Sequence, residues 1–175
     1  ASSPDSISWG SVGKPFTTKQ AWESLRISAP QVGWAKLVWH TLHIPKHAFC
    51  LWLAIQGALN TLDKLVRRGI LTSANCVFNC GENENVDHLF FACPYSQTIW
   101  IEILSKCNIY RPSLPWQEEV RWMTDHARGN KLPQLVRKLA IGATVYQIWL
   151  ERNRRAFKNR FLPPTVIIQK IQGDI

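Results

Sequence analysis

Four potential metal-binding side chains lie close together in the middle of this 175-residue chain. From Cys76 to Cys93 the sequence follows the pattern Cys-x3-Cys-x7-His-x4-Cys, with Cys80 as the second member and His88 as the third. Zinc binds four such ligands in a tetrahedron, and the short gap between the first two cysteines allows a tight turn to bring both sulfurs to one ion. Gly81 directly follows Cys80 and favours that turn. The fold must therefore bring these four side chains to one point.

A site made by these residues would be structural. Four protein ligands fill a tetrahedral zinc ion and leave no position for a catalytic water, so the metal would stabilise folding directly. The alternative is a chance cluster of buried thiols and a core histidine, because free cysteine behaves as a small hydrophobic residue. We predict a structural Zn²⁺ site, and we expect Cys50 and Cys107 to be core or interface thiols. The predicted ligands are Cys76, Cys80, His88 and Cys93.

The composition predicts a folded intracellular protein. Hydrophobic residues make up 46% of the chain and charged residues only 19%, which is too apolar for a disordered segment. Polar residues interrupt every apolar run before it reaches the roughly 20 residues that span a bilayer. The first ten residues lack the features of a secretory signal, and the five cysteines suit a reducing compartment. We therefore expect an intracellular protein, or part of a longer chain, without a membrane span.

Apolar residues recur three and four positions apart along most of the chain, which predicts an all-α fold. Thr17 or Thr18 can cap the first helix, and Pro45 and Pro94 stand where proline begins a helix. One helix is expected to end before Pro30 and a short one to lie between Thr61 and Gly69. The others are expected at 34–42, from Pro45 to about Gln56, from Asp87, and at 94–107, 116–128, 133–157 and 165–172.

Two prolines between Arg111 and Trp116 mark the predicted domain boundary. We expect residues 5–107 to form an irregular helical domain with a structural zinc knuckle. Residues 116–172 would then form a C-terminal helical segment with one long helix, in which Gly142 marks close packing against a neighbour.

Most tryptophans are expected in the core, with the indole N–H bonded to a local acceptor. Trp9 and Trp116 lie near loops, where an aromatic ring can stack on a base or on a partner side chain, but packing is the expected role for both. The tryptophans on apolar helix faces are Trp22, Trp34, Trp39, Trp52, Trp100 and Trp149.

The net charge of +9 favours a polyanionic partner, but the charge is uneven. It amounts to +3 over residues 1–60, −1 over residues 61–100 and +7 over residues 101–175. Cations at the end of the long helix also oppose the negative end of the helix dipole, which is an alternative explanation for them. The candidate nucleic-acid contacts are Arg67 and Arg68 beside the zinc loop, and Arg152, Arg154, Arg155, Lys158 and Arg160 at the end of that helix.

Five segments carry a resemblance to a known family: D-x-I-x-W at 5–9, FTTKQAW at 16–22, VWHTLHIPKHAFCLWLAIQGALNT at 38–61, DKLVRRG at 63–69 and DHLFFACPYSQTIW at 87–100. They resemble the zinc-binding domain found downstream of the reverse transcriptase in plant non-LTR (LINE-type) retroelements. The resemblance covers about residues 5–100, and residues 146–157 (YQIWLERNRRAF) are similar to the connector that precedes a ribonuclease H domain in such polyproteins. The resemblance implies that Cys76, Cys80, His88 and Cys93 are the zinc ligands. It also implies an ancestral setting in the RNA-templated copying of an element into DNA.

An enzyme is not expected. Two-metal chemistry needs clustered carboxylates, whereas the acidic residues here are expected to be solvated in the zinc loop (Glu82, Glu84 and Asp87) or on a helix face (Glu118 and Glu119). The histidines near Cys50, which are His40, His43 and His47, do not by their spacing establish a base within reach of a nucleophile.

Two functions follow as hypotheses. The first is a non-catalytic, zinc-stabilised helical module that binds RNA or DNA, or that orients the polymerase on its template. The second is a structural or protein-interaction subunit of a ribonucleoprotein or other assembly, domesticated from a retroelement. Possible partners are thus a nucleic acid, another protein or the parent polyprotein, and no small-molecule substrate is expected. An element's polymerase would work in the nucleus, whereas a recruited copy could serve another compartment.

Overall fold

The computed structural model describes residues 16–27, 30 and 32–175, which fall into two units divided between Val32 and Gly33. The first unit contains helix α1 (Thr18–Leu25), whose first turn is capped as expected: the Gln20 N–H donates to the Thr17 hydroxyl at 3.2 Å. The predicted domain start at residue 5, and Trp9, lie outside the described residues.

Residues 33–175 form one helical unit, and the predicted all-α class is confirmed. The described part of the chain contains no strand, only an isolated antiparallel bridge between Asn75 and Asn83. None of its helices is both long enough and apolar enough to cross a membrane. The elements are α2 (Ala35–Val38), α3 (Pro45–Ile55), α4 (Leu62–Arg67), the π-helical turn η1 (His88–Ala92), α5 (Pro94–Lys106), α6 (Trp116–His126), α7 (Leu132–Lys158) and α8 (Pro164–Asp174).

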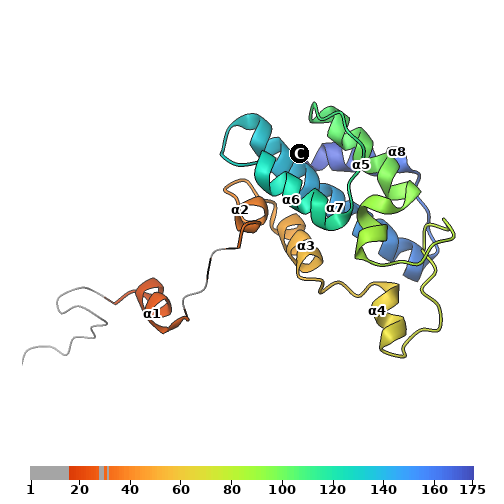
Figure 1. Ribbon diagram of the computed structural model, residues 1–175, viewed down its shortest axis with the longest axis horizontal. Helices are drawn as coiled ribbons and strands as arrows, with labels where there is room; N and C mark the ends of the chain where they lie inside the picture. The colour runs from red at the N-terminus through yellow and green to blue at the C-terminus, as the bar shows by residue number, and fades with distance from the viewer. Residues whose placement is uncertain (1–15, 28–29, 31) are drawn as a thin grey trace, which may run out of the picture. The chain divides into compact units, whose positions relative to one another are not determined.

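The long helix α7 is the centre of this unit and contacts α2, α3, α5, α6, α8 and η1 (Figure 1). Residues 140–145 of α7 are buried without a break, because neighbours cover the helix on all sides there. At Gly142 an added Cβ would lie 3.6 Å from the Cβ of His47, so α3 and α7 are in van der Waals contact, as predicted. The core of the unit therefore forms around a helix that follows the metal-binding segment in sequence.

The structure does not divide the chain at residues 107–116, where the prolines predicted a domain boundary. Trp116 is buried, with its ring centroid 5.1 Å from that of Phe90 and 5.5 Å from that of Phe91. The Ser113 hydroxyl also donates to the Phe91 carbonyl at 2.8 Å. These contacts join the segment before α6 to η1, so the C-terminal helices share one core with the cysteine cluster.

Fewer tryptophans are buried in the core than the sequence predicted. Trp100 is buried as expected, but its indole N–H has no hydrogen-bond partner among the described residues, contrary to the prediction. Trp22 and Trp39 are exposed. Helix α2 ends at Val38 and not at Leu42, so Trp39 is its C-terminal cap residue and does not lie on a long buried face. Trp34, Trp52 and Trp149 are partly buried and pack against the core.

Candidate metal centre and its surroundings

The four predicted ligands meet at one point. One ligand atom from each of Cys76, Cys80, His88 and Cys93 lies within 4.8 Å of the others. The Cys76 and Cys93 sulfurs are 3.9 Å apart, close to the sulfur–sulfur edge of about 3.8 Å in a tetrahedron with Zn–S bonds of about 2.3 Å. The Cys80 sulfur lies 3.1 Å from Nε2 of His88. The geometry is that of a closed, four-ligand site.

Two local structures bring the ligands together. Cys76 and Cys80 lie in a tight loop in which Asn79, just before Cys80, and Gly81, just after it, have positive φ. The Cys76 N–H donates to the Glu82 carbonyl at 2.9 Å. His88 begins η1 and Cys93 directly follows it, and the Cys93 N–H donates to the His88 carbonyl at 2.7 Å. The sequence predicted an α-helix here, but the five-residue spacing matches the i to i+5 hydrogen bond of a π-turn.

The site also favours a thiolate at Cys93, which caps the N-terminus of α5. The hydrogen bond from the Cys76 thiol, together with the N–H groups of Tyr95 and Ser96, lowers the pKa of Cys93 to about 5. The same contact with Cys93, together with burial, raises the pKa of Cys76. Without a metal, the ionisation of one of these two adjacent thiols disfavours the ionisation of the other. A bound dication would stabilise both of them as thiolates.

Residues 16–100 match the family model described as zinc-binding in reverse transcriptase. The match covers just under half of the chain, so this segment is similar to the zinc-binding domain of reverse transcriptases, and we call it the zinc-binding domain below. Searches of curated proteins and of solved structures gave no match. The Cys/His cluster lies inside the matched segment and is consistent with a structural Zn²⁺ ion.

The zinc-binding domain is joined to α7 by a buried ion pair that the sequence analysis missed. Arg152 is 2% exposed, and its guanidinium contacts the carboxylate of Glu84, which is fully buried in the loop between Cys80 and His88, at 2.9 and 3.0 Å. Glu84 also accepts a hydrogen bond from the Leu62 N–H at the start of α4. The prediction of a solvated Glu84 is wrong, and Arg152 is not open to a phosphate.

A second buried carboxylate holds the neighbouring arginines. Glu151 accepts hydrogen bonds from Arg154, from Arg155 and from the Leu162 N–H. The Arg155 guanidinium also lies over two rings of the zinc-binding domain, 4.8 Å from the centroid of Phe78 and 4.4 Å from that of Tyr95. Arg155 is therefore mostly a structural cation, and its side chain is only 10% exposed. Glu119 is buried as well, paired with Arg111, and not solvated as predicted.

The other candidate nucleic-acid contacts are on the surface. Arg67 pairs with Asp63 at 2.9 Å, and Arg68 donates to the Asn60 side chain at 2.9 Å, but both remain exposed. Lys158 and Arg160 are exposed and form no ion pair with any described residue. The structure thus divides the candidate nucleic-acid contacts into basic side chains that are paired inside the fold and basic side chains that are exposed.

The cysteines outside the cluster do not form a nucleophilic site. Cys50 is buried, and desolvation raises its pKa to about 12, the opposite of what an activated thiol requires. Cys107 is partly buried, and desolvation also raises its pKa. Both positions agree with the predicted packing role.

Proposed function

We propose that this chain is a non-catalytic, zinc-stabilised helical module, from or derived from a retroelement reverse transcriptase, that binds nucleic acid or orients the polymerase on its template. The observation that carries the proposal is the closed Cys76, Cys80, His88 and Cys93 cluster within a segment that matches a reverse transcriptase family. A plant non-LTR element and a connector toward ribonuclease H at residues 146–157 are part of this proposal, as is a nuclear site of action.

Basic side chains open to solvent support the nucleic-acid role. Lys158, Arg160, Arg67 and Arg68 remain exposed after the internal arginines are set aside. Each cation that meets a phosphate contributes about 0.7 to 0.9 to the dependence of log affinity on log salt.

The test is the affinity of the zinc-loaded chain for single-stranded RNA, single-stranded DNA and duplex DNA over a range of salt concentrations. The proposal predicts affinity that falls steeply as salt rises. Weak binding that does not depend on salt for any of the three would contradict it.

A second candidate function is protein interaction, and α1 favours it. Trp22 and Leu25 on this helix, and Ile27 beyond it, are exposed apolar side chains of the kind that dock on another protein. A Trp22→Ala, Leu25→Ala variant would then lose a protein partner in a pull-down and keep its affinity for nucleic acid. The first proposal expects the reverse for a Lys158→Gln, Arg160→Gln variant.

A further inference from the structure

A basic pocket opens beside the loop between α2 and α3. Its volume is about 260 Å³, enough for a phosphate group and part of a base. No acidic residue lines it. The lining residues are Lys36, Trp39, His40, Thr41, Gly129, Asn130 and Lys138.

Lys138 is a buried cation without a counter-ion among the described residues. It is 4% exposed, and its ammonium donates to the Gly129 carbonyl at 2.7 Å. An ammonium group has three N–H donors, and a buried charge is costly unless it is paired. The Gly129 carbonyl accepts one of these hydrogen bonds but does not neutralise the charge. An anion in the pocket would therefore supply the counter-ion of Lys138.

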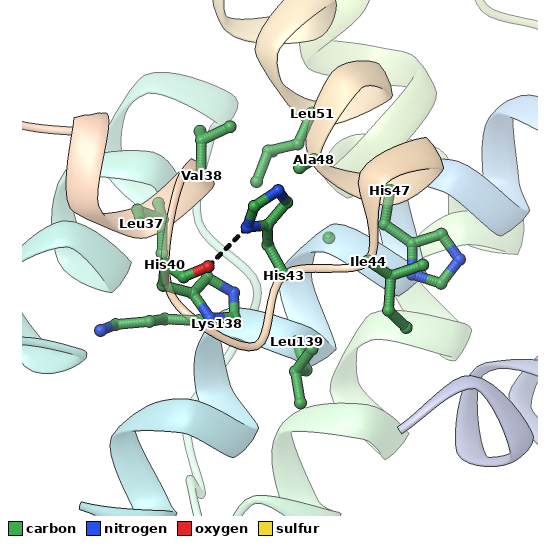
Figure 2. A pocket seen from close by; sticks show the side chains of 11 residues that line it. Leu37, Val38, His40, His43, Ile44, His47, Ala48, Leu51, Lys138 and Leu139 are labelled. Carbon is green, nitrogen blue, oxygen red and sulfur yellow. Dashed lines mark hydrogen bonds between the residues drawn. The ribbon is translucent and has the colours of Figure 1, made fainter. Parts of the chain in front are cut away.

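The basic groups of this pocket act on one another. Desolvation and then the charge of Lys36 lower the pKa of Lys138. Desolvation, Lys138 and His43 lower the pKa of His40 to about 4, and Nδ1 of His40 is buried without a hydrogen-bond partner. Figure 2 shows Lys138 beside His40. A bound anion would offset the repulsion that these groups share.

The smaller cavity next to the pocket is not the binding space. It also touches His40 and Lys138, but its volume of about 10 Å³ admits about one water molecule. His47 lies on the other side of that cavity from His40, and its Nε2 is 3.5 Å from Asp174 (Figure 2). Of these two adjacent spaces, the basic pocket is the one with room for a ligand.

Trp39 gives the pocket an aromatic surface. It is 46% exposed, and its ring meets that of His43 edge to face with centroids 5.8 Å apart. This contact orients the indole and leaves about half of the side chain open. A cationic hollow beside an open aromatic ring is the combination that binds single-stranded nucleic acid, in which phosphates meet cations and bases stack.

We propose that this pocket binds a phosphate of single-stranded nucleic acid through Lys36 and Lys138, and that Trp39 stacks on the adjoining base. This inference rests on the proposed nucleic-acid function and names one of its contact sites.

The test uses the zinc-loaded chain and labelled single-stranded RNA and DNA of about 12 nucleotides. Affinity is measured against salt for the wild type, for Lys36→Gln and for Trp39→Ala. The matched control is Lys170→Gln on α8, which removes an exposed lysine that has no ion pair among the described residues. Thermal melting checks that each variant is folded.

We expect Trp39→Ala to weaken binding roughly 5- to 150-fold and Lys36→Gln to reduce the salt slope by about 0.7, while Lys170→Gln binds like the wild type. If the wild type binds and all three variants match it, the pocket assignment is wrong and the proposed function stands. If the wild type does not bind, both fail.

A second measurement does not depend on the variants. Inorganic phosphate added to the full chain should shift the ring signals of His40 in NMR spectra and raise its pKa, because an anion favours the protonated ring. An unchanged His40 titration at saturating phosphate would overturn the site.

Discussion

Two groups of basic side chains in this molecule carry charges of the same sign but have different surroundings. At the α7 end (Arg152, Arg154 and Arg155), the guanidinium groups are paired with the buried carboxylates of Glu84 and Glu151. In the basic pocket, Lys36 and Lys138 have no carboxylate partner among the described residues, and Lys138 is buried all the same.

Because of this difference, we expect the two groups to have different roles, one in stability and the other in binding. The α7 end attaches the long helix to the zinc-binding domain, so changes there should reduce stability. The pocket has uncompensated charge that faces an open space, so changes there should reduce binding. The density of basic residues in the sequence does not distinguish the two groups. The fold brings Glu84 to Arg152 from 68 residues away, and it buries Glu151, which lies only three and four residues from the arginines that it pairs with.

Removal of the metal should have the largest effect on stability, because it acts on the zinc-binding domain to which the α7 end is attached. Structural zinc sites contribute on the order of 10 kcal/mol of binding free energy. We expect EDTA to lower the free energy of unfolding by more than any substitution below and to reduce the helical circular dichroism signal. Melting that is unchanged by EDTA, in a chain shown to contain zinc beforehand, would contradict this.

Loss of the Glu84 carboxylate is the next largest change. Glu84→Gln leaves the guanidinium of Arg152 buried without its counter-ion, which should cost about 3–5 kcal/mol in urea unfolding. The control is Asp125→Asn, which removes the exposed ion pair with Arg128 and should cost less than about 1 kcal/mol. Equal effects for the two variants would show that burial does not distinguish these pairs.

The basic pocket should make stability depend on pH. The pKa of His40 is about 4 in the folded chain, against an ordinary value of 6.5, so the unfolded chain takes up the proton first as the pH falls. The stability present above about pH 6.5 is therefore lost as the pH falls from 6.5 to 4. The full shift corresponds to about 3 kcal/mol, and solvent screening at this partly open site makes the loss smaller than that. Relative to the wild type, His40→Gln should flatten this decline, and a parallel decline in both proteins would contradict the assignment.

The exposed cations beyond the α7 end should have the smallest effect on stability. Lys158→Gln and Arg160→Gln should each change the free energy of unfolding by less than about 0.5 kcal/mol. If these residues contact phosphates, each substitution should lower the salt slope of nucleic-acid binding by about 0.7 to 0.9. A variant that is destabilised but keeps the wild-type salt slope would show that these residues stabilise the fold and do not contact nucleic acid.

Local signals in the sequence predicted the helices and the ligand set. Pro45, Pro94 and the Thr17 cap mark helix starts by their own chemistry, and the Cys76 to Cys93 spacing depends on a short loop. The failures concern distant contacts. Nothing near Glu84 indicates that Arg152 will neutralise it, and the prolines before Trp116 do not reveal that its ring packs on η1. Pairing across 68 residues is a property of the fold.

X-ray absorption at the zinc edge, on chain purified without added metal, tests the central claim most directly. A site made by Cys76, Cys80, His88 and Cys93 predicts one zinc per chain, with three sulfur ligands at about 2.3 Å and one nitrogen ligand at about 2.0 Å. The absence of stoichiometric zinc, or a shell of oxygen ligands with fewer than three sulfurs, would contradict the account.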